Sequence, residues 1–348
     1  MGAVETVLGQ ARAAGRPSLV TYVTAGIRAD WTSLLAAMID AGADAVEIGL
    51  PFSDPMLDGP VIQQASETAL GRGANTTAIL AGLRRARPRA GQDGEVPLIA
   101  MSYANHAYHR GIARYCGELS GAGFSGTIIP DLPAGEADEY LAAAAAAGLD
   151  ATLMVTPATP PAQMRAIARR SRGFLYVMSV MATTGSTHEH EDERRWALAA
   201  QALAAQAPAT QAPATQAPAA QAPAAQAPAT QVPATQAPAT RVPAAQAPAT
   251  QAPATQALAA RAPGAAGGPE GWGGRTVGEK QDSARPVLIG FGIDTPARAA
   301  AAVRHADGVI VASALMRQVL NGAAPADIAR TVGDLRAAID AARAPARP

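Results

Sequence analysis

The sequence predicts an α/β protein built as a closed (β/α)8 barrel (TIM barrel), interrupted late in the chain by a long repeat. Short apolar segments alternate with Ala/Leu/Arg-rich stretches of helical spacing, an order typical of βαβ units around a parallel sheet. The repeat aside, 283 of the 348 residues remain, close to the ~250 that a single barrel needs. An open doubly wound sheet is the alternative, but no G-x-G-x-x-G follows the first apolar segment.

Eight apolar segments are expected to form the strands, because each is short, rich in Val, Ile and Leu, and flanked by glycine, proline or polar residues. They are Ser18–Thr24, Ala45–Gly49, Pro97–Met101, Gly126–Ile129, Ala151–Val155, Phe174–Val177, Val287–Gly290 and Gly308–Val311. The clearest helical patterns between them are Trp31–Ala41, Ile112–Ala122, Glu136–Ala147, Ala162–Ser171 and Asp192–Ala205.

A five-residue repeat, mostly QAPAT or QAPAA, runs from Gln201 to Ala265. Proline at every fifth position excludes regular helix, so a polyproline-like disordered segment is expected. We therefore divide the chain into residues 1–205 with strands one to six, an insertion at 206–284, and 285–348, which completes the barrel. The insertion replaces a helix-to-strand connection between helix six and strand seven. Such connections lie opposite a barrel's active site, and the repeat has either no function or a tethering one.

The composition narrows the class of protein. The net charge is zero and no basic face stands out, so nucleic acid is not an expected partner. The only cysteine, Cys116, is expected to be a buried apolar residue. The first twenty residues lack a signal sequence, and no apolar run approaches the ~20 residues of a membrane span. We expect a cytoplasmic protein.

The chain has one lysine, Lys280, beside 27 arginines. An aldolase that acts through a Schiff base needs a lysine in its barrel, and this lysine lies in the Gly-rich end of the insertion. That route to carbon–carbon cleavage is therefore strongly disfavoured. A phosphate group would have to be held by backbone N–H groups, helix ends, hydroxyls or arginine.

The segment VEIGLPFSDPMLDGP, from Val46 to Pro60, carries the main candidate site. Glu47 lies within an apolar strand, where burial should raise its pKa and allow it to transfer a proton. Asp58 follows in a more polar loop, where it should stay ionised. Two carboxylates in different environments are typical of acid/base sites. The alternative for Glu47 is a structural acid held by backbone N–H groups, and Asp54 is expected only to hold the SDP turn.

Together with YVTAG, MSYAN, IIPDLP and GFGI, this segment closely resembles the tryptophan synthase alpha subunit family. The resemblance extends from Tyr22 to about Ala338, outside the insertion. It implies retro-aldol cleavage of indole-3-glycerol phosphate to indole and glyceraldehyde 3-phosphate. It also implies a beta subunit as partner. That subunit would hold pyridoxal phosphate, and this chain would need no cofactor.

The resemblance assigns roles to single residues. Glu47 becomes the proton shuttle, Asp58 the anion that pairs with the indole N–H, and Tyr176 their neighbour. The expected lining of the indole pocket is Tyr22, Met101, Tyr103 and Ile128, with Asp131 as a scaffold residue of the same pocket.

The phosphate site is expected in the loops after strands seven and eight, where barrels often bind phosphate. Gly292 in GFGI would let backbone N–H groups approach the ligand, and Ser313 in VASA can cap a helix and donate its hydroxyl. Gly185 of the sixth loop joins them by resemblance.

Three departures from the family pattern matter. Ile27 and Arg28 follow YVTAG where the family has Asp-Pro. Ala182 and Thr183 replace Gly-Val in the lid of the sixth loop, and Ala312 replaces a glycine near the phosphate. Both carboxylates remain, so cleavage is favoured over partnership. A free-standing lyase that releases indole, or a non-catalytic barrel acting as a binding or regulatory subunit, remain as alternatives.

Two histidine patterns resemble metal sites. HEHEDE, at 188–193, has no second cluster and is expected to be a solvated loop. His106 and His109 have H-x-x-H spacing without the glutamate of a zinc helix, so both are expected at the surface. We therefore expect no metal.

Overall fold

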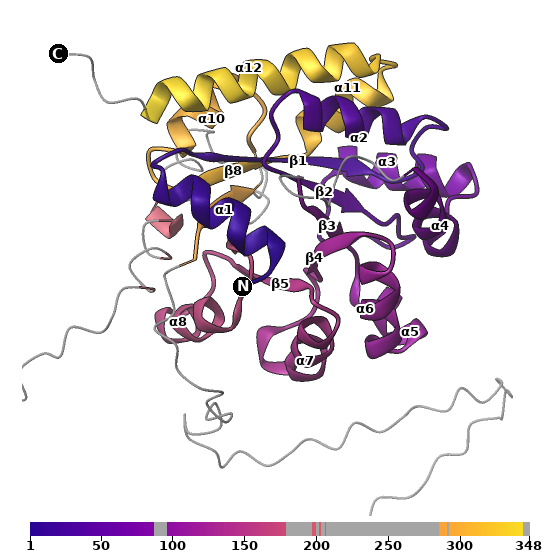
Figure 1. Cartoon of the computed structure of the whole chain (residues 1–348), viewed down its shortest axis with the longest axis horizontal. Coiled ribbons are helices and arrows are strands. Elements are labelled where there is room, and N and C mark those ends of the chain that lie inside the picture. The colour runs from indigo at the N-terminus through magenta and orange to yellow at the C-terminus, as the bar shows by residue number, and fades with distance from the viewer. Residues whose placement is uncertain are drawn as a thin grey trace, which may run out of the picture. The chain divides into compact units, whose positions relative to one another are not determined.

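Eight parallel strands form a closed barrel with the order β1 to β8, which confirms the predicted fold (Figure 1). The computed structural model describes residues 1–86, 96–178, 197–199, 202, 206, 285–290 and 292–343. The barrel belongs to a unit spanning Met1–Pro208 and Ser283–Pro348. The strands are β1 (Ser18–Thr24), β2 (Ala45–Gly49), β3 (Leu98–Met101), β4 (Phe124–Ile128), β5 (Asp150–Val155), β6 (Leu175–Met178), β7 (Val287–Gly290) and β8 (Gly308–Val311).

Four strands have the expected bounds, and the others differ by one or two residues. Strand β3 starts after Pro97, which has no N–H for the strand ladder. Strand β4 starts before Gly126, at the buried Phe124, because a shift in register between Leu98 and Ile99 brings Leu98 opposite Phe124.

Helices surround the strands, with α2, α10, α11 and α12 on one side and α5 to α8 on the other (Figure 1). The expected helix at 136–147 is instead a short 3₁₀ turn followed by α7. The helices are α1 (Ala3–Ala13), α2 (Trp31–Asp40), α3 (Pro60–Gly71), α4 (Thr76–Ala86), α5 (Ala104–Arg110), α6 (Ile112–Ser120), η1 (Ala134–Glu136), α7 (Asp138–Ala146), α8 (Pro161–Arg170), α10 (Pro296–Ala302), α11 (Ser313–Leu320) and α12 (Pro325–Arg343).

Of the helix expected at 192–205, the structure describes residues 197–199 and 202, which are helical, with Leu198 and Ala202 buried. The predicted insertion lies outside the described residues apart from Gln206. Cys116 is fully buried, as expected. None of the described helices is long and apolar enough to cross a membrane.

Helix α1, which the sequence patterns did not single out, fills the end of the barrel where the strands begin. Its Val4 and Leu8 are fully buried against Val20 of β1, Ile99 of β3 and Phe174, which directly precedes β6. Asp150 of β5 accepts a hydrogen bond from the Glu5 N–H at 3.0 Å and so satisfies a free donor at the start of this helix. With that end filled, the carboxyl ends of the strands are left for a site.

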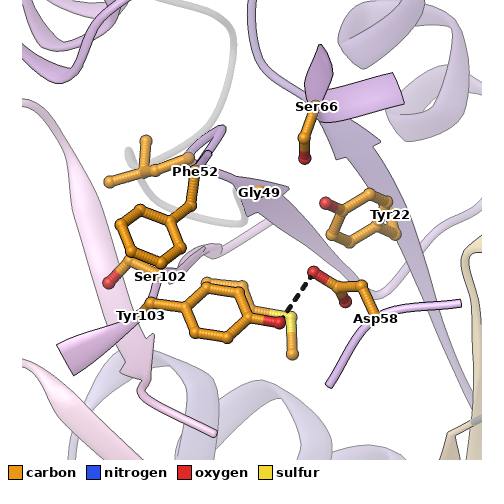
Figure 2. A pocket seen from close by; sticks show the side chains of 9 residues that line it. Tyr22, Gly49, Phe52, Asp58, Ser66, Ser102 and Tyr103 are labelled. Carbon is orange, nitrogen blue, oxygen red and sulfur yellow. Dashed lines mark hydrogen bonds between the residues drawn. The ribbon is translucent and has the colours of Figure 1, made fainter. Parts of the chain in front are cut away.

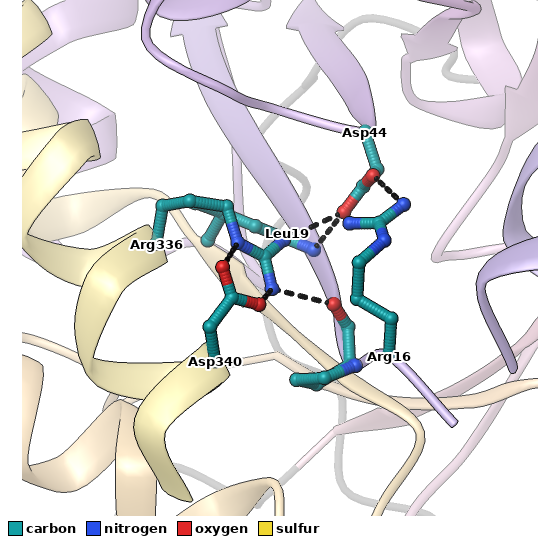
Figure 3. A network of polar contacts seen from close by, with 6 residues as sticks. Arg16, Leu19, Asp44, Arg336 and Asp340 are labelled. Carbon is teal, nitrogen blue, oxygen red and sulfur yellow. Dashed lines mark hydrogen bonds and ion pairs between the residues drawn. The ribbon is translucent and has the colours of Figure 1, made fainter. Parts of the chain in front are cut away.

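Helix α12 is joined to the first two strands by an arginine–aspartate network (Figure 3). Asp44, just before β2, accepts hydrogen bonds from the Leu19 N–H at 2.8 Å, from Arg16 at 2.5 Å and from Arg336 of α12 at 2.9 Å. Arg336 also donates to the Pro17 carbonyl at 2.8 Å. Segments about 300 residues apart in sequence are thus fixed together.

A single side chain joins the two ends of the predicted insertion. The Gln206 amide donates to the Arg285 carbonyl at 3.0 Å and accepts from the Arg285 N–H at 2.6 Å. This reciprocal pair resembles the pairing of two strands, and it holds residue 285 next to Gln206, directly before β7.

Candidate active site

Glu47 lies in the middle of β2 and is 1% exposed. Its neighbours across the ladder are Tyr22 of β1 and Ile99 of β3. Neither carboxylate oxygen has a hydrogen-bond partner among the described residues. A structural acid held by backbone N–H groups would have such partners, so the geometry contradicts that alternative.

The surroundings of Glu47 disfavour its charged form. Burial raises its pKa to about 8, and the negative charge of Asp58 adds to the shift. The group is therefore largely protonated at neutral pH and can both give up and take back a proton there. A strongly shifted, unpaired carboxyl group inside a barrel is a candidate acid/base group.

Asp58 lies in the loop between β2 and α3 and is half-buried. Its Oδ2 accepts a hydrogen bond from the Tyr103 hydroxyl at 3.1 Å. Burial raises the Asp58 pKa to about 6, and the Tyr103 hydrogen bond opposes part of that rise. The loop folds over the barrel mouth and partly removes the carboxylate from water, which is why its pKa is raised. Asp58 is nevertheless mostly ionised at neutral pH.

Asp58 forms part of a pocket at the carboxyl ends of β1 to β3 (Figure 2). Three of the expected lining residues, Tyr22, Met101 and Tyr103, are brought together in it. The full lining is Tyr22, Gly49, Leu50, Phe52, Asp58, Ser66, Met101, Ser102 and Tyr103. Its aromatic and apolar walls with a single carboxylate suit a flat ring that carries one hydrogen-bond donor.

Two glycines at strand ends make room for two tyrosines. A β-carbon on Gly49 would lie 1.9 Å from the Tyr22 hydroxyl, and one on Gly290 would lie 2.2 Å from the Tyr176 hydroxyl. Both tyrosines therefore cross the barrel mouth directly over a neighbouring strand. Any larger residue at either glycine would displace the ring above it.

Tyr176 of β6 is 3% exposed and belongs to the barrel interior. Burial raises its pKa well above the usual range, and the charges of Glu47 and Asp58 act in the same direction. Ile128 is also fully buried in that interior, beside Met101 in the β3–β4 ladder. Ile128 thus lies next to a lining residue but is itself absent from the lining.

Asp131, in the loop after β4, accepts a hydrogen bond from the Ala104 N–H at 2.8 Å. This bond holds the start of α5, directly after the pocket residue Tyr103. Asp54 is exposed and accepts a hydrogen bond from the Ser53 hydroxyl at 2.7 Å within the SDP turn.

The expected phosphate residues lie after neighbouring strands. Gly292, two residues beyond β7, has φ of 72°, a left-handed conformation that favours glycine. Ser313 is the first residue of α11, while Ala312 occupies the N-cap position without a side-chain cap. The expectation that Ser313 caps this helix is therefore wrong, because the helix begins at Ser313 itself, one residue earlier than a cap at this position would require. The φ of Ala312 is −116°, which any residue can adopt. Gly185, Ala182 and Thr183 lie outside the described residues.

Of the other departures from the family pattern, Ile27 is buried and Arg28 contacts Asp30 and Ala323. Arg28 pairs with Asp30 through two hydrogen bonds of 2.9 Å and donates to the Ala323 carbonyl at 2.6 Å. The loop after β1 is thereby tied to the connection between α11 and α12.

Sequence reasoning missed several pocket residues. Phe52 stacks on Tyr103, with ring centroids 5.0 Å apart, and Ser66 of α3 is buried with its hydroxyl at the pocket. The position of Phe52 inside the SDP-containing loop was the one available signal. His106 is half-buried with an edge contact to Phe52, so the expected surface position is wrong for it, whereas His109 is exposed.

HEHEDE lies outside the described residues. Among the residues described, no group of three or more His, Cys, Asp or Glu side chains could hold a metal ion.

A closed barrel that carries a buried, unpaired glutamate and a neighbouring aspartate at its mouth defines a (β/α)8 enzyme of the acid/base class. Comparison with known proteins gives the family. The sequence profile of the tryptophan synthase alpha chain matches residues 8–215 and 277–340. The chain belongs to the tryptophan synthase alpha chain family.

Individual relatives agree with this assignment. The tryptophan synthase alpha chain of Microcystis aeruginosa is 41% identical over 189 residues, which cover 53% of this chain and 69% of the relative. That of Laribacter hongkongensis is 40% identical over 191 residues, 53% and 70% of the two chains. Among solved structures, tryptophan synthase subunit alpha from Legionella pneumophila superposes with a TM-score of 0.67 at 25% identity, covering 98% of this chain and 99% of that one.

Proposed function

We propose that the chain cleaves indole-3-glycerol phosphate to indole and glyceraldehyde 3-phosphate with Glu47 and Asp58 as the reacting carboxyl groups. Membership of the tryptophan synthase alpha chain family makes it a carbon–carbon lyase of tryptophan biosynthesis. The observation that carries the residue assignment is the buried Glu47 carboxyl, which has no protein partner among the described residues and lies close enough to Asp58 for the two to interact electrostatically.

The reaction divides between the two groups according to their surroundings. Glu47, protonated at neutral pH, donates its proton to the indole carbon that bears the glycerol side chain. The ring nitrogen then becomes electron-poor, and the Asp58 carboxylate stabilises it through the N–H. As the carbon–carbon bond breaks, the neighbouring side-chain hydroxyl loses its proton, which returns Glu47 to its protonated form. No step needs a metal or a cofactor in this chain.

The other predicted residues bind and enclose the substrate in this proposal. Tyr22, Met101 and Tyr103 hold the indole ring, and Tyr176 closes the interior beneath the reacting carbon. Gly292 and Ser313 supply a backbone N–H and a hydroxyl to the phosphate, together with Gly185. Ile128 and Asp131 support the pocket through Met101 and the start of α5.

A beta subunit that holds pyridoxal phosphate is the proposed partner. Membership of the tryptophan synthase alpha chain family supports this partner, and a solved structure of tryptophan synthase from M. tuberculosis has a similar fold (TM-score 0.67, 23% identity). At that identity the likeness concerns the fold alone. The substitutions Ala182 and Thr183 in the sixth loop favour weaker coupling to such a partner. A cytoplasmic location of the chain stays a prediction.

The test is indole release from indole-3-glycerol phosphate by the purified chain, alone and with a beta subunit. Slow release that rises sharply with the partner would support the alpha-subunit role. Fast release that the partner does not change would favour the free-standing lyase. Measurable association without release would favour the non-catalytic barrel.

Asp58→Asn tests the residue assignment. Removal of the anion should lower kcat/KM by at least ~100-fold, the usual scale for a positioned catalytic group, without changing the thermal unfolding midpoint greatly. Near-normal activity in this variant would contradict the proposal. Asp54→Asn, an exposed acid in the same loop, is the matched control and should keep its activity.

A further inference from the structure

The loop that carries Asp58 is fastened to one tyrosine at two points. The Tyr103 hydroxyl accepts a hydrogen bond from the Leu57 N–H at 3.0 Å and donates one to Asp58 Oδ2 at 3.1 Å. The donor, the hydroxyl and the carboxylate thus form a short chain of aligned bonds. In such a chain each bond polarises the next, and the acceptor at its end is stabilised in its charged form.

The ring of Tyr103 is also held in place by aromatic neighbours. Phe52, from the same loop as Asp58, stacks on it at an interplanar angle of 22°. His106 of α5 meets the edge of Phe52 at 5.3 Å and 69°. Phe52, Tyr103 and His106 form what we call the aromatic bracket, which joins the β2–α3 loop to the β3–α5 segment. Such aromatic contacts favour a fixed relative orientation of the rings.

We propose that Tyr103 is a positioning residue that holds the Asp58 carboxylate at the pocket and keeps it ionised, beyond its part in lining the pocket wall. This inference rests on the proposed role of Asp58. In this inference the aromatic bracket fixes the conformation of the β2–α3 loop before substrate binds. The Tyr103 hydroxyl favours the charged form of Asp58.

The groups that face Asp58 support this assignment. Glu47 from β2, Tyr22 from β1 and Tyr176 from β6 interact with it electrostatically, and each of them has its own pKa raised by the Asp58 charge. Burial raises the Asp58 pKa, and the Tyr103 hydrogen bond is the contact that lowers it.

The bracket brings further charged groups near. Asp131 interacts with both Tyr103 and His106, and Arg110 and His109 of α5 interact with His106. Burial and Arg110 lower the His106 pKa, which favours the neutral ring.

Tyr103→Phe separates this role from that of a pocket wall. The phenylalanine ring keeps the stack with Phe52 and the apolar surface of the pocket, but it loses both hydrogen bonds. If Tyr103 acts only as a wall, the substitution changes KM and leaves the titration of Asp58 unchanged. If it positions the carboxylate, the titration moves.

The experiment is a carboxyl-carbon NMR titration of the full chain labelled at aspartate, with Asp58 assigned by Asp58→Asn. We expect Tyr103→Phe to raise the Asp58 pKa by about one unit, the scale of one hydrogen bond to a charged group. The acid limb of kcat/KM for indole release should move to higher pH by the same amount. Tyr108→Phe, at an exposed tyrosine of α5, is the control and should change neither quantity.

An unchanged Asp58 titration in Tyr103→Phe would overturn the inference, whatever happens to activity. Full activity in Asp58→Asn would overturn the proposed function instead. The titration still decides about Tyr103 in that case, because it reports on the carboxylate without requiring catalysis.

Discussion

At the scale of single residues, the site is defined by one carboxyl group that the barrel does not satisfy. A buried polar group without a partner costs free energy, and Glu47 has two such oxygens among the described contacts. Because the fold retains this unfavourable free energy, we infer that the Glu47 carboxyl group is available for a hydrogen-bond partner that the protein itself does not supply. The pKa values of Glu47 and Asp58 follow from their burial and from each other's charge.

The pH dependence of catalysis follows from these two values. Asp58 must be ionised, so activity is lost as pH falls through about 6; Glu47 must be protonated, so activity is lost as pH rises through about 8. We expect a bell-shaped profile of kcat/KM for indole release with apparent pKa values near these, which belong to the interacting pair. A profile that stays flat between pH 5 and 9 would contradict this assignment.

Glu47→Gln should be inactive but more stable. The Glu47 pKa is raised on folding, so its contribution to stability is fully present below about 4.5 and is lost as pH rises through about 8. The glutamine side chain of the variant does not ionise, so the variant does not lose stability in this way as pH rises. Its thermal midpoint should exceed that of the parent at pH 8, by about 2–4 °C per kcal/mol recovered, and the two midpoints should converge near pH 4.5. Calorimetry at both pH values measures this; a lower midpoint at pH 8 would show that the carboxylate is stabilised after all.

At the scale of elements, the carboxyl end of each strand decides what the pocket can hold. Strand β2 ends in Gly49, and Tyr22 of β1 lies over it. The strand thus presents Glu47 to the interior and then leaves space for a neighbouring ring. Gly49 of VEIGLPF is therefore needed for the packing of Tyr22, in addition to being part of the family motif.

Gly49→Ala tests this packing. The new methyl group would lie 1.9 Å from the Tyr22 hydroxyl and 2.5 Å from its ring carbon, so the ring must move. We expect a loss of about 1–3 kcal/mol in the free energy of unfolding and a raised KM in the indole-release assay. Gly333→Ala in α12 is the matched control, because no atom lies within 4 Å of its β-carbon. It should be neutral or slightly stabilising, and equal effects of the two substitutions would contradict the argument.

At the scale of the whole molecule, the barrel has to close although 78 residues separate Gln206 from Arg285. The Gln206 amide provides a local solution, because it pairs both backbone groups of Arg285 immediately before β7. Closure of the barrel then depends on this contact and on the ladder of β6 with β7, and the intervening length has a small effect.

Two variants follow. Replacement of residues 208–284 by a short Gly/Ser linker should preserve folding and indole release, because Gln206 and Arg285 are retained.

Gln206→Ala in the full chain should lower the free energy of unfolding by about 1–2 kcal/mol, the scale of two hydrogen bonds, in denaturant titrations. Gln64→Ala, at an exposed glutamine of α3, is the control. Insoluble protein from the linker variant would show that the segment takes part in folding.

Much of this molecule could be predicted from residue order. The barrel followed from eight apolar segments at βαβ spacing, and the positions of Glu47 and Asp58 followed from one strand–loop motif. Residues that pack through contacts distant in sequence were harder to place. His106 was expected at the surface and lies against Phe52, and helix α1 was not recognised as the group that fills the barrel end.

The sequence by itself determined the fold class, the strand bounds to within two residues and the pair of candidate acids, because period, turn residues and strand length are local properties of the chain. Only the tertiary structure decided that Glu47 has no hydrogen-bond partner among the described residues, that Asp58 is half-buried with a raised pKa, and that Tyr103 holds it. Burial and pairing are set by neighbours from other strands and loops, which come together only when the barrel closes.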